Sequence, residues 1–501
     1  MSRSYRKILR NRKRRIERRL APRNWEDQEQ PMFTASNIHY EVAERTEAIS
    51  YGGIGAIHKM VKNLGLAEEI DRNLHLLKKH LPYHESDHVL NLAYNALLGG
   101  IRLEDIELRR NDEVFLNALG AQRIPDPTTS GDFTRRFAEE DILKLMEVFN
   151  GIRKHLWKRQ RKGFLAEAII DIDGTIARTL GECKEGMDIS YKGIWGYGPL
   201  IISLANSKEV LFLVNRPANV PSHDGSAVWI DRAIDLVKDH AGKILLRGDT
   251  DFSLTANFDR WSKDADFIFG MDASATLVGR AKQLPETAWK DIQRPSKYTV
   301  KTETRPKPKR VKDRIVKERQ FKKLRLRSEQ VAEFPYSPGK CSHDYRMVVV
   351  RKNISVEKGD HALFDEIRYF FYITTKKKIS ARKVVLLANQ RCDQENVIEQ
   401  LKNGVNAMRM PVDNLLSNWA YMVMTALAWN LKAWFALLMR KSPQKGLVLK
   451  MEFRRFLHAI IMMPCQIIRT GRKIVFRLLG YNSWTSVFLT TFERILRLEV
   501  T

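Results

Sequence analysis

The chain has 501 residues, of which 44% are hydrophobic, so it is long enough for about two to four domains with cores of their own. Lys and Arg number 86 against 59 Asp and Glu, which gives a formal net charge of +27. Such an excess favours a polyanionic partner, with nucleic acid as the first expectation and a membrane surface as the alternative. The four cysteines are scattered without a CxxC pair, which argues against a zinc site and a disulfide framework and suits a reducing cytoplasm.

Residues 1–35 are rich in Arg and Lys and are expected to form a basic N-terminal tail, either disordered until it is bound or a solvated arm without a role. No apolar segment follows the basic residues, so a secretory signal is not expected. Residues 36–162 are expected to form a helical domain, because the stretch HVLNLAYNALLGG spaces its apolar residues by three and four and ends on glycines.

Residues 163–272 alternate strand-like and helix-like segments. The runs GFLAEAIIDIDGT and PLIISLANSKEVLFLVN predict three strands, of which the last two are joined by a hairpin turn at 206–208. Helix, strand, helix and strand follow, in SAVWIDRAIDLVKDHAG, KILLRGD, FSLTANFDRWSKDA and DFIFGMD. The opening hairpin implies antiparallel pairing, and the later crossovers imply parallel pairing. This order predicts an α/β fold of the RNase H-like type, with a mixed five-stranded sheet flanked by helices.

Residues 273–375 interrupt this pattern with a β-rich basic insertion, in which YRMVVVRKNI and IRYFFYITT are typical of strands. Its Lys- and Arg-rich stretch either contacts DNA or forms a charged surface hairpin. Residues 376–440 return to helical patterns and are expected to complete the core, and residues 441–501 to form a basic, mostly helical C-terminal region. The apolar stretch NLLSNWAYMVMTALAWNLKAWFALLM is interrupted by polar residues, so we expect a buried core helix and not a membrane span.

Three acidic positions stand out. In IIDIDGT, alternate residues of a strand share one face, so Asp171 and Asp173 point the same way. In LLRGDTDF, Asp249 ends a buried strand at the edge of the sheet. In RCDQENVIEQLKNG, a helical period of about 100° per residue places charged residues on one stripe and apolar residues on the opposite, buried side. The charged stripe consists of Arg391, Glu395, Glu399 and Lys402, and the buried side of Val397, Leu401 and Val405.

Carboxylates from two neighbouring strands and one packed helix would form a cage of hard oxygen ligands. Mg²⁺ or Mn²⁺ prefers such ligands, and two ions can activate an attacking oxygen and stabilise a leaving one in phosphoryl transfer. We therefore predict Asp173, Asp249 and Glu395 as catalytic residues and ligands of two Mg²⁺ or Mn²⁺ ions. Arg391 and Lys402 are predicted to bind phosphate. Each motif alone also has an ordinary structural interpretation, because acids often end strands and charged helix stripes are usually solvated.

Between about Ser130 and Trp429 the chain resembles the DDE-type insertion-sequence transposases. The sequence 173–175, DGT, matches their first motif, and the sequence 247–249, RGD, matches their second. The branch that it resembles most is the insertion-sequence family numbered 1380. The segments YKGIWGYGPLIISLANS and VNRPANVPSHDGSA, and a β-rich insertion between the second and third acids, also resemble that family.

The third acid of this group lies in a helical Tyr–Arg–Glu–Lys signature. Arg391, Glu395 and Lys402 stand at the spacing of that signature. Ala388 occupies the position of the tyrosine, so any phosphate or base contact made by that tyrosine is in question here.

The resemblance implies a metal-dependent cut-and-paste enzyme that binds the terminal inverted repeats of its own element. Water would attack the phosphodiester at the element end, and the freed 3′-OH would then attack target DNA. The resemblance also implies double-stranded DNA as the partner, a homodimer or higher synaptic assembly, no membrane association, and a location at the nucleoid in a prokaryotic cytoplasm. By elimination, residues 36–162 are assigned to recognition of the DNA ends.

Two alternatives stay open. DIDGT is also the DxDGT box of haloacid dehalogenase-like phosphatases, in which Asp171 would accept the phosphoryl group, Asp173 would act as general acid and base, and Glu395 would be dispensable. That interpretation leaves the basic charge unexplained. The second alternative is a catalytically inactive transposase derivative that only binds DNA. In a transposase, Asp171 is expected to pair with a buried base or to lie next to the metal ligands without binding the metal. Asp251 and Glu399 are likewise expected to be neighbours of the metal ligands.

Overall fold

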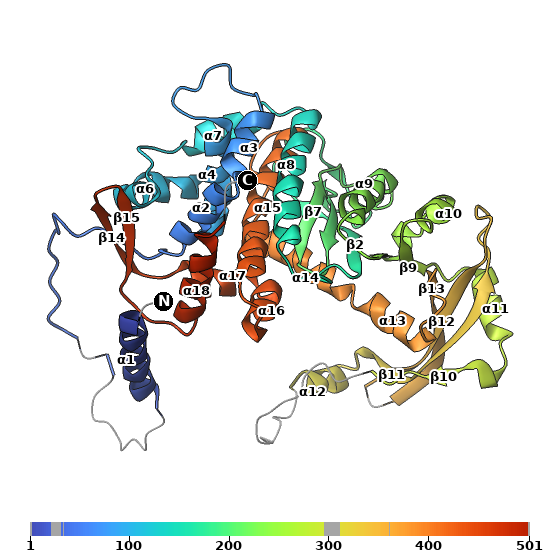
Figure 1. The fold of residues 1–501 in the computed structure, drawn as a ribbon. Coiled ribbons are helices and arrows are strands. Elements are labelled where there is room, and N and C mark those ends of the chain that lie inside the picture. The colour runs from blue at the N-terminus through green and yellow to red at the C-terminus, as the bar shows by residue number, and fades with distance from the viewer. Residues whose placement is uncertain (1–2, 22–31, 34, 295–310, 360, 499–501) are drawn as a thin grey trace.

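The computed structural model describes residues 3–21, 32–33, 35–294, 311–359 and 361–498 (Figure 1). A helical region, which includes elements from near both ends of the chain, packs against one large mixed sheet. The sheet runs from this helical region out to a set of long strands on the far side of the molecule (Figure 1).

The helical region is built around the long helix α15 (Leu415–Leu438), against which α4, α7 and α8 pack. Its early helices are α2 (Ile54–Asn63), α3 (Leu66–Asn73), α4 (Glu85–Leu97), α5 (Glu107–Arg110), α6 (Glu113–Leu119), α7 (Pro127–Thr134) and α8 (Glu139–Lys158). In the described part of the chain, α15 is the one helix long and apolar enough to cross a membrane, and its whole apolar window is buried inside the fold. The indole N–H groups of Trp419 and Trp429 donate to the backbone carbonyls of Leu213 and Lys208, respectively. The prediction of a buried core helix is confirmed.

Nine strands of the described chain form one mixed sheet, in the order β10-β11-β12-β13-β9-β8-β2-β6-β7. They are β2 (Ala168–Gly174), β6 (Leu200–Leu204), β7 (Glu209–Val214), β8 (Ile244–Gly248), β9 (Asp266–Met271), β10 (Lys290–Asp291), β11 (Lys322–Tyr336), β12 (Tyr345–Lys358) and β13 (His361–Thr374). Strands β2, β8 and β9 run parallel, whereas β6 pairs antiparallel with both β2 and β7. The part β7-β6-β2-β8-β9 therefore has the predicted RNase H-like order, and the α/β fold class is confirmed.

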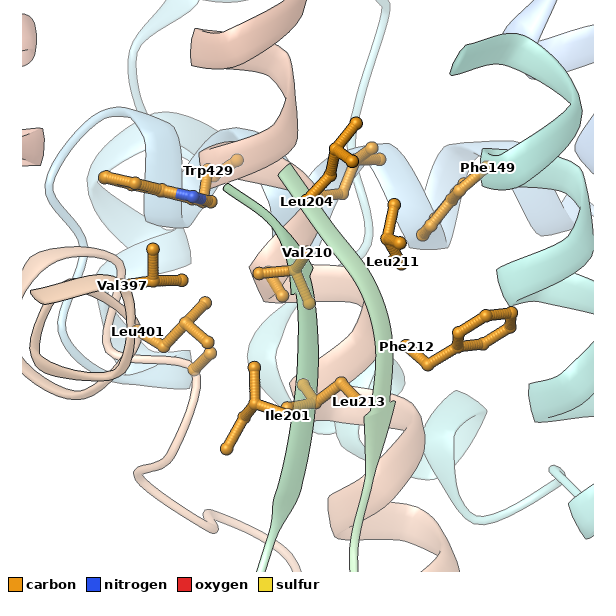
Figure 2. Packing of buried hydrophobic residues seen from close by; sticks show 14 of the residues in the cluster. Phe149, Ile201, Leu204, Val210, Leu211, Phe212, Leu213, Val397, Leu401 and Trp429 are labelled. Atoms are coloured by element: carbon orange, nitrogen blue, oxygen red, sulfur yellow. The ribbon is translucent and has the colours of Figure 1, made fainter. Parts of the chain in front are cut away.

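Helices cover both faces of this five-stranded part. Figure 2 shows Val397 and Leu401 on one side of the hairpin β6–β7, and Phe149 of α8 and Phe212 on the other. The first side is covered by α14 (Cys392–Glu399), and the second by α8 and α9 (Ser226–Lys238), whose Trp229 ring packs against Phe212. Every residue of β6 and β7 is buried, which explains their unbroken apolar runs in the sequence.

The insertion continues the core sheet instead of forming a separate unit. Its last strand, β13, pairs antiparallel with β9 and thereby adds β12, β11 and β10 to the same sheet. Helices α11 (Ala275–Lys282) and α12 (Val311–Glu318) belong to this region. Val384 and Val385 of α13 (Ala381–Asn389) pack on Val348 and Val350 of β12, so α13 spans the junction. The predicted β-rich character is confirmed, but part of its basic stretch, residues 295–310, lies outside the described residues.

Two terminal segments differ from expectation. Part of the tail expected to be disordered forms helix α1 (Arg3–Leu20), and its Arg12 side chain donates to the carbonyl of Leu478 over 3.0 Å. The C-terminal region expected to be mostly helical contains helices α16 (Pro443–Lys450), α17 (Phe453–Phe456) and α18 (Thr485–Ile495), but also a hairpin. That hairpin, β14 (Cys465–Thr470) with β15 (Lys473–Leu478), also pairs with β1 (Ala48–Ile49), and Gly471 turns it with a φ of 54°.

Candidate active site

The first acidic motif lies on β2, the central strand of the five-stranded part. The carboxylate of Asp171 receives two hydrogen bonds from Arg247 on the adjacent strand β8, from Nε over 2.6 Å and from Nη2 over 2.7 Å. Both side chains are almost fully buried, with 1% and 2% of their surface exposed. The remaining guanidinium nitrogen of Arg247, Nη1, donates to the carbonyl of Leu387 in α13 over 2.9 Å. Arg247 thus ties two strands to the helix that leads into the third acidic motif.

This pairing confirms the interpretation of Asp171 as the partner of a buried base. Both of its carboxylate oxygens are held by a planar guanidinium, and the side chain has no open side. A phosphoryl-accepting nucleophile must reach its substrate. The burial of Asp171 therefore argues against the haloacid dehalogenase-like alternative, in which this residue would be the nucleophile.

Asp173, two residues later, lies near the carboxyl end of β2, and its side chain is partly exposed to solvent. Its Oδ2 atom is 2.8 Å from Nη1 of Arg391. Burial raises the pKa of Asp173 to about 6, Arg391 opposes this shift, and the negative charge of Asp249 adds to it. Asp249 follows β8 directly, and its pKa is also raised, by burial first and then by the nearby Asp251. The two aspartates therefore lie close enough for their charges to repel.

The third motif begins where α13 gives way to α14. Arg391 stands at the N-cap of α14, and Glu395 lies in its first turn, exposed to solvent. Burial lowers the pKa of Arg391, but the charges of Asp173, Asp249 and Glu395 outweigh this and raise it overall. One guanidinium is thus within electrostatic reach of all three predicted acids, which come from two adjacent parallel strands and one helix.

In the part of the chain that the structure describes, no three His, Cys, Asp or Glu side chains approach one another closely enough to hold a metal ion. Arg391 places a positive charge directly beside Asp173. The structure brings the predicted residues into one neighbourhood without assembling a closed ligand cage.

The helix α14 is held in place by polar contacts that the sequence patterns did not single out. Gln394 is fully buried, accepts a hydrogen bond from the hydroxyl of Ser203, and donates to the carbonyl of Ile201 over 3.1 Å. Lys208, at the tip of the β6–β7 hairpin, pairs with Asp393 over 2.6 Å. The spacing of Gln394 from Val397 and Leu401, three and seven residues, was the available signal that it belongs to the buried face.

The charged stripe does not continue as a regular α-helix. After Glu399 the chain forms a π-helical turn, Gln400–Gly404, in which the N–H of Val405 donates to the carbonyl of Gln400. Val397, Leu401 and Val405 are buried as predicted. Glu399 accepts a hydrogen bond from Asn403, while Lys402 lines a cleft beside the acids.

The loop ahead of α9 lines the same cleft through His223. The carbonyl of His223 accepts a hydrogen bond from Ser226, and that of Asp224 accepts one from Arg216 over 2.8 Å. These contacts are those of a turn that leads into a helix.

A family model described as "Transposase DDE domain group 1" matches residues 39–500. Among solved structures, the chain is similar to the piggyBac transposase in its cryo-EM synaptic complex with hairpin DNA, at 12% sequence identity and a TM-score of 0.34, over 82% of this chain and 81% of that one. No curated protein matches the sequence. The finer placement in the insertion-sequence family numbered 1380 stays a prediction. Because the family model spans nearly the whole chain, the chain belongs to the transposase DDE domain group 1 family.

Proposed function

We propose that the chain is an active transposase, which cuts the phosphodiester bonds at the inverted-repeat ends of its element and joins the freed 3′-OH ends to target DNA. The observation that carries this proposal is the gathering of Asp173, Asp249 and Glu395 within electrostatic reach of Arg391. Membership in the transposase DDE family supports the same reaction class. The excess of 27 positive charges favours a polyanionic substrate.

The donor set suits divalent cations. Asp173 and Asp249 are partly buried carboxylates whose charges repel, so a cation beside them would relieve an unfavourable interaction. We propose that Asp173, Asp249 and Glu395 hold two Mg²⁺ or Mn²⁺ ions together with phosphate oxygens of the substrate and water. When bound, such ions supply Lewis-acid charge and lower the pKa of a coordinated water.

The cationic side chains of the site would position the DNA strand. Arg391 opposes the protonation of Asp173 by pairing with it, and its planar fork is suited to a phosphate group once DNA competes for it. Lys402 adds a point charge inside the cleft. Asp171 and Arg247 hold β2 and β8 in register, so that the two aspartates at the strand ends keep their separation.

DNA recognition and assembly follow from the same reaction. We propose that residues 36–162 recognise the element ends, that the basic insertion of residues 273–375 contacts DNA, and that two or more copies pair the two ends of the element. A prokaryotic enzyme of this kind would act in the cytoplasm at the nucleoid. The assignment of residues 36–162 rests on elimination, that of the insertion on its Lys- and Arg-rich stretch, and that of the assembly on the needs of cut-and-paste chemistry.

The experiment is a cleavage assay with the full chain on linear DNA that carries the end of its element. We expect cuts that expose a 3′-OH, and transfer of that end into a supercoiled plasmid, in Mg²⁺ or Mn²⁺ but not in EDTA. Asp249→Asn should bind the DNA without cutting it. The matched control is Asp272→Asn, because Asp272 is an exposed acid that follows β9 as Asp249 follows β8.

Two results would replace this proposal. Binding without cleavage in either metal would favour an inactive DNA-binding derivative. Release of phosphate from a small phosphomonoester, lost in Asp171→Asn and kept in Glu395→Gln, would favour the phosphatase.

A further inference from the structure

The helical region leaves one strand edge and one apolar groove uncovered. Among the described strands, β15 pairs only with β14, so its other edge is free. A groove of about 850 Å³ lies between β15, α2 and α18, and we call it the hairpin groove. Its apolar lining includes Ala56, Leu119, Ile474, Phe476, Phe488 and Phe492.

The direction of the backbone groups of β15 follows from the hairpin turn. The residues that flank this two-residue turn are partners, so they form a hydrogen-bonded pair, and such pairs recur at every second residue of the ladder. Ile474, Phe476 and Leu478 therefore direct their N–H and C=O groups toward the free edge. The carbonyl of Leu478 agrees with this, because it accepts a hydrogen bond from Arg12 of α1 over 3.0 Å. The edge is thus able to pair with a further strand.

The side chains of these residues lie on the groove side of β15. A Cβ atom on Gly55 of α2 would lie 2.6 Å from the ring of Phe476, so this ring packs directly on the helix backbone. Ile474, two residues away, shares that face and is 42% exposed. Lys59 and Lys473 also line the groove. An added strand that carries apolar residues on one face and carboxylates on the other would suit this surface.

Residues 37–44 have the pattern of a strand but no partner strand among the described residues. Their sequence, NIHYEVAE, places Ile38, Tyr40 and Val42 at alternate positions, so these side chains share one face of an extended chain. They are 63%, 96% and 94% exposed, in a coil that runs along the outside of the fold (Figure 1). Single exposed apolar residues are ordinary, but three in strand alternation favour burial against another strand. The segment has two carboxylates and no Lys or Arg, in a chain of net charge +27.

We propose that residues 37–44 of one copy add as a strand to the free edge of β15 in a second copy, and that the exchange is reciprocal. Within one chain, the segment leads to the wrong edge of the sheet. The carbonyl of Glu47 accepts a hydrogen bond from the N–H of Ile467, and β1 pairs with β14 on the side away from β15. The segment would therefore have to cross both strands of its own hairpin.

A second copy removes this constraint, because a two-fold axis makes the two exchanged contacts equivalent. The choice of a second copy also rests on the proposed function, which needs two copies to pair the element ends. The contact itself needs no DNA.

The faces and charges of the two strands indicate a register. In an antiparallel pair with Tyr40 opposite Phe476, Ile38 and Val42 also face the hairpin groove, because opposed residues share a face. Glu41 then lies opposite Val475 on the other face, diagonal to the two cations of β15. Opposite charges at such cross-strand positions stabilise the pairing.

The test is a disulfide between copies, formed without DNA. In this register Glu41 and Val475 are a non-hydrogen-bonded pair with Cα atoms about 4.5 Å apart, which a disulfide can span. A chain with Glu41→Cys is mixed with a chain with Val475→Cys, both carrying Cys183→Ser and Cys392→Ser to remove the exposed native thiols. Mild oxidation should link one chain of each kind into a covalent dimer. The matched control uses Val42→Cys in place of Glu41→Cys, which faces the opposite side and should not link.

A second measurement reads the same contact by affinity. Tyr40→Ser should weaken self-association of the full chain by about 10- to 30-fold in analytical ultracentrifugation, because an aromatic side chain is no longer removed from water. Tyr191→Ser, which changes a tyrosine that is 87% exposed elsewhere, should self-associate as the wild type does.

Three results would overturn the inference. They are no link between the mixed chains, an equal link from Val42→Cys, and wild-type self-association in Tyr40→Ser. A disulfide that forms only within one chain carrying both Glu41→Cys and Val475→Cys would also overturn it, because the segment would then fold back on its own hairpin. Failure to cut element-end DNA would contradict the proposed function and leave the cross-link unchanged, so the two failures are distinguishable.

Discussion

The guanidinium of Arg391 lies 2.8 Å from the carboxylate of Asp173, although 218 residues separate them in the chain. The contact joins the start of α14 to the end of β2 and brings a residue predicted to bind phosphate against one predicted to bind metal. Arg391 gives Asp173 the positive charge that a metal ion would supply, and Asp173 gives Arg391 the negative charge that a DNA phosphate would supply. If metal and phosphate bind together, they would therefore replace this ion pair. On the proposed function, the pair would link substrate binding to metal binding.

The first prediction concerns the pH dependence of stability. The pKa of Asp173 is raised from 3.8 to about 6, so the folded chain favours the protonated acid. Ionisation of Asp173 therefore lowers the free energy of unfolding. This loss is absent below about pH 4 and complete above about pH 6. Without divalent cations, Asp173→Asn should be more stable than the wild type at pH 7, by up to about 3 kcal/mol. The measurement is thermal unfolding at both ends of this range.

The difference between the two proteins should vanish near pH 4. A variant less stable than the wild type at pH 7 would show that the Arg391 pair outweighs the burial of the carboxylate. Asp272→Asn, which changes an exposed acid at the end of a strand, should have the same melting temperature as the wild type at every pH.

The second prediction concerns metal binding to the folded chain. Mg²⁺ or Mn²⁺ should raise the melting temperature of the wild type, because a ligand of the native state stabilises by about 2.7 kcal/mol at a hundred times its Kd. Asp173→Asn and Asp249→Asn should lose most of this response, and Asp272→Asn should keep it. An equal metal response in all four proteins would place the ions elsewhere on the chain.

The third prediction concerns the buried pair of Asp171 and Arg247. Arg247→Met leaves the carboxylate of Asp171 buried without its partner, so unfolding in urea should show a loss of about 3 to 5 kcal/mol. The double variant with Asp171→Leu should recover much of that loss, because the uncompensated charge is gone. Lys238→Met, which breaks the exposed pair with Asp235, should have no measurable effect. A small loss in Arg247→Met would mean that water reaches the pair.

The fourth prediction concerns the placement of α14. Gln394→Ala removes the hydrogen bonds to Ser203 and Ile201 that seat the helix on β6. We expect cleavage to slow by about 10- to 100-fold with DNA affinity unchanged, because a small displacement of Glu395 misaligns the reacting groups. Asn396→Ala, two residues on and exposed, should cut at the wild-type rate. Wild-type cleavage by Gln394→Ala would show that α14 is seated by its apolar face alone.

The strands of the RNase H-like part could be predicted because β2, β6, β7, β8 and β9 are short apolar runs between turn residues, and their order restricts the topology. The pairing of β13 with β9 could not, since it joins strands about a hundred residues apart and depends on tertiary packing. The hairpin β14–β15 was missed because the region is short and basic and its apolar residues do not alternate with polar ones, as the consecutive Ile474, Val475 and Phe476 show.

The candidate site was predictable only in part. Asp173, Asp249 and Glu395 were singled out from strand ends, helical spacing and the family resemblance, and they lie within electrostatic reach of Arg391, which was expected to face phosphate, not Asp173. The stripe through Lys402 assumed a regular helix, and the π-helical turn at Gln400–Gly404 changes the rotation between Glu399 and Lys402. Gln394 was overlooked because polar residues are usually solvated, and its burial depends on partners nearly 200 residues away.

The most direct test of the central claim compares wild type, Glu395→Gln and Glu399→Gln in cleavage of element-end DNA with Mg²⁺. Glu395 lies within electrostatic reach of Arg391, which also reaches the two aspartates, whereas Glu399 lies one turn further along the same helix and accepts a hydrogen bond from Asn403. We predict that Glu395→Gln binds DNA but does not cut it, and that Glu399→Gln cuts. Cleavage by Glu395→Gln at the wild-type rate would show that this carboxylate is ordinary surface charge and would contradict the account.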